Sequence, residues 1–154
     1  MAQFLLVTTL LTIAGLIATV VTGFQAAPDR AAQHILFALA TTVVGLFSQS
    51  MTMFFFIGTG KEIKEKANEG GDQAEAVAQT RRFKAQVFPA ATYAMAAIMI
   101  TFITGGGVGS GRTPRLLHDV LAFGTIALFA RAYWVEIRAM DENAKLMEKY
   151  LKSE

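Results

Sequence analysis

Two histidines, His34 and His118, are the side chains in this 154-residue sequence with the clearest capacity to bind a cofactor. Each stands at the start of an apolar stretch, and residues 34–41 align without a gap on residues 118–125. The two segments share His, Ala and Thr, and they carry apolar residues at three further positions. This match indicates an internal repeat that brings two imidazoles to equivalent places.

The spacing around each histidine predicts that both imidazoles face the interior of a helix bundle. Small or weakly polar residues recur at steps of three and four along each segment, which places them on one stripe of a helix. Such stripes are where membrane helices pack closely. The first stripe consists of His34, Ala38, Thr41, Gly45, Ser48 and Thr52, and the second of His118, Ala122, Thr125 and Ala132.

Two neutral imidazoles that face each other in a bundle can be the axial ligands of a haem iron. We therefore expect haem b, with His34 and His118 as the ligands of its iron. Because haem propionates are costly to leave in hydrocarbon, they need basic partners. The expected partners are Arg30, Arg112 and Arg115, and the expected pocket residues are Ala38, Thr41, Ala122 and Thr125.

Two other interpretations of the histidines stay open, namely another metal and a purely structural role. Two ligands leave a zinc or copper shell half filled, and the sequence offers no third histidine or suitably placed carboxylate. The absence of cysteine excludes disulfides, thiolate metal sites and covalently attached haem. Asp119, next to His118, is a candidate acceptor that would orient an imidazole.

Four long helices have to position these residues. The hydrophobic fraction of 53% and the mean hydropathy of +0.42 are too high for an ordinary soluble domain. Four windows without charge each approach the roughly 20 residues that cross a bilayer core, where the backbone has to be helical. The predicted helices are residues 4–24, 32–68, 73–105 and 115–150, in one domain over 1–154.

The basic residues predict the orientation of this bundle. Six Lys or Arg lie between Lys61 and Lys84 and five lie from Arg131 onward, against three on the opposite side. The positive-inside rule then predicts that both termini and the hairpin of residues 61–86 are cytoplasmic. The histidines would lie near the periplasmic face, with a bacterial inner membrane as the expected location. The net charge of +2 is too small to indicate nucleic acid binding.

The expected fold is an all-α integral membrane bundle of four transmembrane helices, built from two pseudo-symmetric hairpins. A Thr-Gly pair closes the apolar run before each histidine, at residues 22–23 and 104–105. Two hairpins of the same topology are related by a pseudo-twofold axis along the membrane normal. Helices two, three and four would extend into the cytoplasm. A break is expected at Gly70-Gly71, a kink or restart at Pro89, and a flexible stretch, not a phosphate loop, over residues 105–111.

Other polar and sulfur-containing residues in the predicted helices offer weaker candidates. Ser48-Gln49-Ser50 would line a quinone pocket or a proton path, although hydrogen bonding between helices explains it more simply. Four methionines suit packing: Met51, Met53, Met95 and Met99. The spans contain no cluster of acid, base or nucleophile, so no catalytic residue is expected. A transporter is disfavoured, because no charged residue occupies the expected bilayer centre.

In general layout, two histidines on separate helices resemble the small four-helix cytochrome b anchors of respiratory complexes. The resemblance covers the histidines and their helices, and no longer motif. It implies electron transfer between membrane quinone and a partner protein, without bond-making chemistry. Because little of the chain lies outside the bilayer, a redox partner or larger complex is expected, and a homo-oligomer is left open. The alternative is a cofactor-free structural or assembly subunit of a membrane complex.

Overall fold

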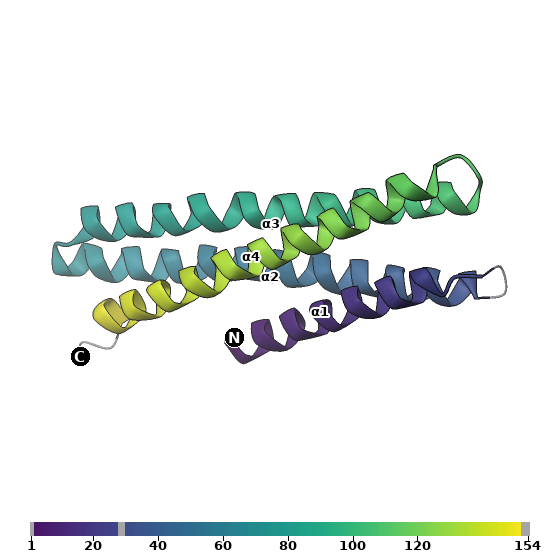
Figure 1. Cartoon of the computed structure of the whole chain (residues 1–154). Helices are drawn as coiled ribbons and strands as arrows, with labels where there is room; N and C mark the ends of the chain where they lie inside the picture. Colours follow the sequence, from purple (N-terminus) through teal and green to yellow (C-terminus); the bar gives the residue numbers. More distant parts are fainter. Residues whose placement is uncertain (1, 28–29, 152–154) are drawn as a thin grey trace.

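The computed structural model describes residues 2–27 and 30–151, which form helices joined by short connections. The helices are α1, Ala2–Phe24; α2, Ala31–Gly70; α3, Gln73–Gly109; and α4, Arg115–Leu151. They run alternately up and down, with the α1–α2 and α3–α4 connections at the same end (Figure 1). All four are long and apolar enough to cross a membrane, as the sequence predicts.

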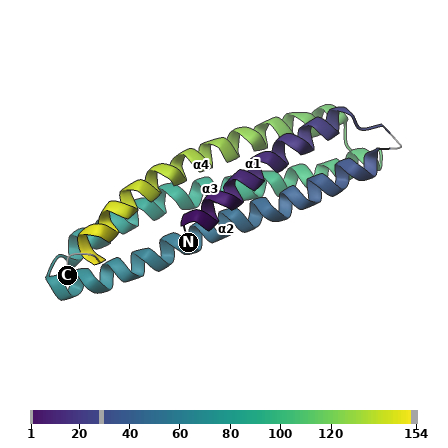
Figure 2. The ribbon, with the colours of Figure 1, turned by 90° about the horizontal axis from the view of Figure 1, so that it is seen from below.

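The short length of α1 divides the bundle into two parts. α1 has 23 residues, whereas α2 has 40 and α3 and α4 have 37 each. At about 1.5 Å per residue, the three longer helices run roughly 20 Å beyond α1. The N-terminus therefore lies midway along the bundle, while the C-terminal end lies near the α2–α3 turn (Figures 1 and 2). Four helices surround the end with the histidines, and three continue to the other end.

Each part of the bundle has its own apolar core. The three-helix part is centred on Phe56, Ile63, Ala67, Ala76, Phe83, Val87, Ala139 and Leu146. The core of the four-helix part consists of Ala94, Ile98, Phe129, Ala132 and Tyr133, with Leu16 and Leu46 packed against it. Many of these side chains are small, which allows the helix backbones to approach closely.

The break predicted at Gly70-Gly71 is confirmed, whereas the flexible stretch predicted over residues 105–111 is helical as far as Gly109, and the helix does not restart at Pro89. α2 ends as predicted at Gly70, where Gly71 takes a φ of 86° and the Asp72 amide donates to the Ala67 carbonyl. α3, however, passes through Pro89 in one continuous helix, so the chain does not restart there. α3 also continues to Gly109, so residues 105–109 are helical and not a flexible stretch. Tertiary packing on α4 therefore outweighs the local preference of these residues.

All four helices meet around Gly45 on α2, which yields a prediction about stability. A Cβ at this position would lie 3.2 Å from both Ile98 Cδ1 and Phe129 Cζ and 3.3 Å from Thr12 Cγ2. Because a larger side chain would overpack the core, Gly45→Leu should lower the free energy of unfolding by about 1–3 kcal/mol. Thermal unfolding of the purified protein measures this, with Gly58→Leu as the control because nothing lies within 4 Å of its Cβ position. Equal unfolding midpoints for the two variants would contradict the packing described.

Candidate cofactor site

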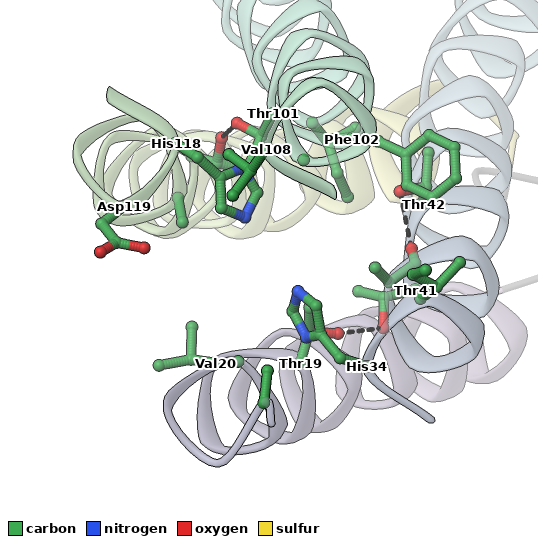
Figure 3. Close-up of a pocket in the computed structure, with 18 of the residues that line it drawn as sticks. Thr19, Val20, His34, Thr41, Thr42, Thr101, Phe102, Val108, His118 and Asp119 are labelled. Atoms are coloured by element: carbon green, nitrogen blue, oxygen red, sulfur yellow. Dashed lines mark hydrogen bonds between the residues drawn. The ribbon is translucent and has the colours of Figure 1, made fainter. Parts of the chain in front are cut away.

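His34 and His118 face each other at the end of the bundle that holds both hairpin connections. His34 lies in the first turn of α2 and His118 in the first turn of α4. Their ring centroids are 6.3 Å apart, and the ring planes are inclined at 81°. Figure 3 shows the two rings reaching toward one another from separate helices. The structure thus brings together the two side chains that the sequence repeat singles out.

The imidazoles border a cavity of about 460 Å³ to which all four helices contribute. This volume lies within the range of about 300–1,000 Å³ that is usual for small-molecule and cofactor sites. The expected pocket residues Ala38, Thr41, Ala122 and Thr125 all line it. Most of the remaining wall is apolar and includes Val20, Ile98, Phe102, Val108 and Ile126. The cavity can therefore take a largely apolar molecule with the imidazoles at its polar positions.

The three arginines expected near the site are placed differently from one another. Arg115 lines the cavity, and its guanidinium donates to the Gly23 carbonyl at 3.5 Å. Arg30 and Arg112 are exposed near the same end of the bundle, but neither is among the cavity-lining residues. Asp119 forms an ion pair with Arg115 at 3.7 Å, one helical turn away. In the described part of the chain, the Asp119 carboxylate accordingly pairs with a guanidinium and not with the His118 ring.

Two glycines support the imidazoles from the neighbouring helices. A Cβ at Gly23 would lie 3.1 Å from His34 Cε1, and a Cβ at Gly105 would lie 2.9 Å from His118 Cε1. At Gly105 a Cβ would be too close for the ring to stay in place, and at Gly23 the ring would have to move by a few tenths of an ångström. The sequence shows both residues as part of the repeat, but sequence reasoning did not assign them to the site.

A threonine hydroxyl contacts the His34 ring. The Thr22 hydroxyl lies 3.3 Å from His34 Nδ1 and 2.9 Å from the Ala18 carbonyl, to which it can donate. When its proton is on that carbonyl, Thr22 accepts from the His34 tautomer that is protonated on Nδ1. The lone pair of His34 is then on Nε2. His118 Nδ1 is buried and has no hydrogen-bond partner within residues 2–27 and 30–151.

The two hairpins contain matching contacts between their helices. In the first, the hydroxyls of Thr19 on α1 and Thr41 on α2 lie 3.0 Å apart. In the second, the hydroxyls of Thr101 on α3 and Thr125 on α4 lie 2.7 Å apart. A threonine–threonine contact and a glycine–histidine contact therefore occur in each hairpin.

No family model, curated protein or solved structure matches this chain. Within its described residues, no group of three or more His, Cys, Asp or Glu side chains could hold a metal ion. The site therefore offers two imidazole ligands, an apolar cavity and one basic side chain at its edge. This set can complete the coordination of a metal that brings most of its own ligands.

Proposed function

We propose that the chain is a membrane cytochrome b-like electron-transfer subunit that holds one b-type haem between α2 and α4. The observation that carries the proposal is the 6.3 Å separation of the His34 and His118 ring centroids across the cavity. Metal–imidazole bonds are about 2.0–2.1 Å long, so two imidazoles on opposite sides of one metal have ring centres roughly 6 Å apart. The 6.3 Å separation of the facing rings matches this spacing.

The residues around the cavity fit a haem better than a bare metal ion. A porphyrin supplies the ligands that the protein lacks, so two imidazoles are sufficient. His34 can present its Nε2 lone pair while its Nδ1 lies 3.3 Å from the Thr22 hydroxyl, the kind of outer hydrogen bond that orients ligating histidines. His118 Nδ1 has no such partner among the described residues. Haem bound there would supply one-electron redox chemistry. The protein would bind the group, orient the imidazoles and exclude water with its apolar wall.

The basic residues at this end suit the propionates of a haem. Arg115 reaches the cavity itself, Arg30 directly precedes α2, and Arg112 lies in the α3–α4 connection at the same end of the bundle. Charge-assisted hydrogen bonds from guanidinium to carboxylate are among the stronger ones in proteins. Arg115 is thus the principal candidate, with Arg30 and Arg112 in supporting positions.

We infer that the four helices span a membrane, with the histidines toward the periplasm and both termini in the cytoplasm. Large apolar side chains are exposed along the outside of the four-helix part, as lipid contact requires. They include Leu6, Leu10, Ile17, Leu36, Val43, Ile100, Ile103, Leu116 and Val120. Eleven of the fourteen Lys and Arg residues lie between Lys61 and Lys84 or from Arg131 onward, which favours a cytoplasmic position for the end of the bundle opposite the histidines. A bacterial inner membrane is the location we propose.

We also infer that the two hairpins arose by duplication and are related by a pseudo-twofold axis. The paired threonines and the glycine–histidine contacts recur in each hairpin, in addition to the match between residues 34–41 and 118–125. Equivalent hairpins would place their two histidines at equal depth on either side of the axis. Such a repeat provides one site with two identical ligands.

A haem in this bundle would need an electron donor and an acceptor. We propose a redox partner or larger membrane complex, with quinone as a candidate electron carrier. The alternative is a cofactor-free structural subunit. One observation favours it, because ring centroids 6.3 Å apart and ring planes inclined at 81° also suit direct edge-to-face contact between the two imidazoles. In that case the imidazoles would only join the two hairpins.

An absorption spectrum of the detergent-purified protein, expressed with ample haem, separates these two functions. The proposal predicts a Soret band in the oxidised protein and a sharp α band after reduction with dithionite, at about one haem per chain. Extraction of the pigment with acidified solvent should release it, because the chain has no cysteine to attach it covalently. A colourless protein under these conditions would exclude the cytochrome function and favour the structural one.

A further inference from the structure

A second group of polar side chains is buried in the middle of the bundle, away from the histidines. At about 1.5 Å per residue, Gln49 lies roughly 20 Å along α2 from His34. The group comes from three helices, and every member is at most 5% exposed. It consists of Thr12 on α1, Ser48, Gln49 and Thr52 on α2, and Tyr133 and Glu136 on α4.

These side chains lie close enough to interact, but without well-formed hydrogen bonds between them. The Tyr133 hydroxyl faces Thr12, Ser48 and Gln49, and the Glu136 carboxylate faces Gln49 and Thr52. Across the described residues, five atoms of the group have no hydrogen-bond partner: Ser48 Oγ, Gln49 Oε1 and Nε2, the Tyr133 hydroxyl and Glu136 Oε1. A buried polar atom without a partner costs about 1–3 kcal/mol and is rare. Five in one place indicate a small bound group between them.

The buried Glu136 carboxylate has no basic side chain beside it in the described part of the group. Glu136 is its single carboxylate, and α1 contains no ionisable residue. Residues 35–60 of α2 and 85–109 of α3 contain no Lys, Arg or His. On α4 itself, Arg131 and Arg138 are exposed. A carboxylate buried without a counter-charge is strongly destabilising, so this one needs a bound cation or a proton.

The oxygen atoms of the group are arranged as acceptors. Thr12 donates its hydroxyl proton to the Thr8 carbonyl at 2.8 Å, and Thr52 donates its proton to the Ser48 carbonyl at 3.1 Å. Both hydroxyl oxygens therefore present lone pairs to the group, as Gln49 Oε1 and the Glu136 carboxylate also do. Oxygen ligands of this kind suit hard cations, whereas transition metals prefer nitrogen or sulfur.

We infer that Glu136, Gln49 and the neighbouring hydroxyls bind one sodium ion. A single carboxylate balances one positive charge, while a divalent ion would leave an uncompensated charge in a buried site. The ligands come from α1, α2 and α4, so bound sodium ties the N-terminal helix to the two long helices. This site is independent of the proposed haem, with which it shares no residue.

Thermal unfolding of the full-length protein in detergent tests the inference. The protein is exchanged into choline chloride at alkaline pH, where protons compete least, and sodium chloride replaces choline at constant ionic strength. Because a ligand that binds only the folded state stabilises it by mass action, the unfolding midpoint should rise with sodium concentration. Glu136→Gln should remove this rise, and Gln49→Leu should weaken it. The exposed Glu142→Gln on the same helix is the matched control and should keep it.

The quantity compared is the change in unfolding midpoint of each variant when sodium replaces choline. A variant with a lower midpoint in choline can therefore still be compared with the wild-type protein. A wild-type protein that does not respond to sodium would overturn the inference, as would an equal response in Glu136→Gln. A wild-type protein that responds to pH but not to sodium would show that Glu136 carries a proton instead, and would also overturn it. If Glu136→Gln does not fold, the wild-type titration and Gln49→Leu decide. None of these measurements depends on haem, so their failure is separate from that of the proposed function.

Discussion

His34→Ala and His118→Ala should each lower the amplitude of the reduced α band of the purified protein by at least about tenfold. Each substitution removes one of two imidazoles whose rings lie 6.3 Å apart across the cavity. Loss of groups that only orient a metal ligand already costs about 10–100-fold in affinity or activity, so loss of a ligand itself should cost at least as much. Spectra of equal amounts of protein before and after dithionite give the measurement.

Two further variants separate ligand loss from misfolding. Gln33→Ala replaces an exposed neighbour of His34 on α2 and should keep the full band. His118→Met should keep a haem with two axial ligands and raise its reduction potential, because methionine ligation has that effect in cytochromes. If both alanine variants keep the α band of the wild-type protein, the haem is bound elsewhere and the assignment of these histidines is wrong.

The helices could be predicted from the sequence because their causes are local. Four uncharged apolar windows and the Gly70-Gly71 break each lie within a short segment, and the structure has the corresponding helices and turn. The end of α3 could not be predicted in this way. Residues 105–109 contain four glycines that suggest flexibility, yet Gly105 makes room for His118 and Gly107 makes room for Thr113. Those partners belong to the next helix and its connection, so local preference says nothing about them.

The part of the candidate site that lies along one face of a single helix could be predicted from the sequence. The step of three and four along α2 and α4 places His34 and His118 on stripes with their pocket neighbours, and the cavity contains both stripes at that end. Glu136 was missed for the opposite reason. It follows the last apolar window and stands among charged residues, a context typical of an exposed tail, yet it is 2% exposed. Only the packing of α4 against the other helices shows that this turn is covered.

Gly105→Leu should lower the haem content of the purified protein by at least about tenfold. Even the Cβ of any residue at this position would lie 2.9 Å from His118 Cε1, so the imidazole has to move away. A leucine side chain would in addition extend into the cavity that Gly105 lines. Because ligation needs both imidazoles on one axis, displacement of one ring should prevent it. Haem content per chain, determined from the extracted pigment, measures the effect.

Gly124→Leu is the matched control for this substitution, because nothing lies within 4 Å of a Cβ at that position and Gly124 is not among the residues that line the cavity. Both variants replace a helical glycine and gain a similar helix propensity, up to about 1 kcal/mol. Gly124→Leu should therefore keep its haem and be no less stable than the wild-type protein. Gly105→Ala, in which the ring has to move by only a few tenths of an ångström, should fall between the two and covers the case in which Gly105→Leu does not fold. Equal haem content in Gly105→Leu and Gly124→Leu would mean that the position of the His118 ring does not matter for haem binding, and would contradict ligation by His118.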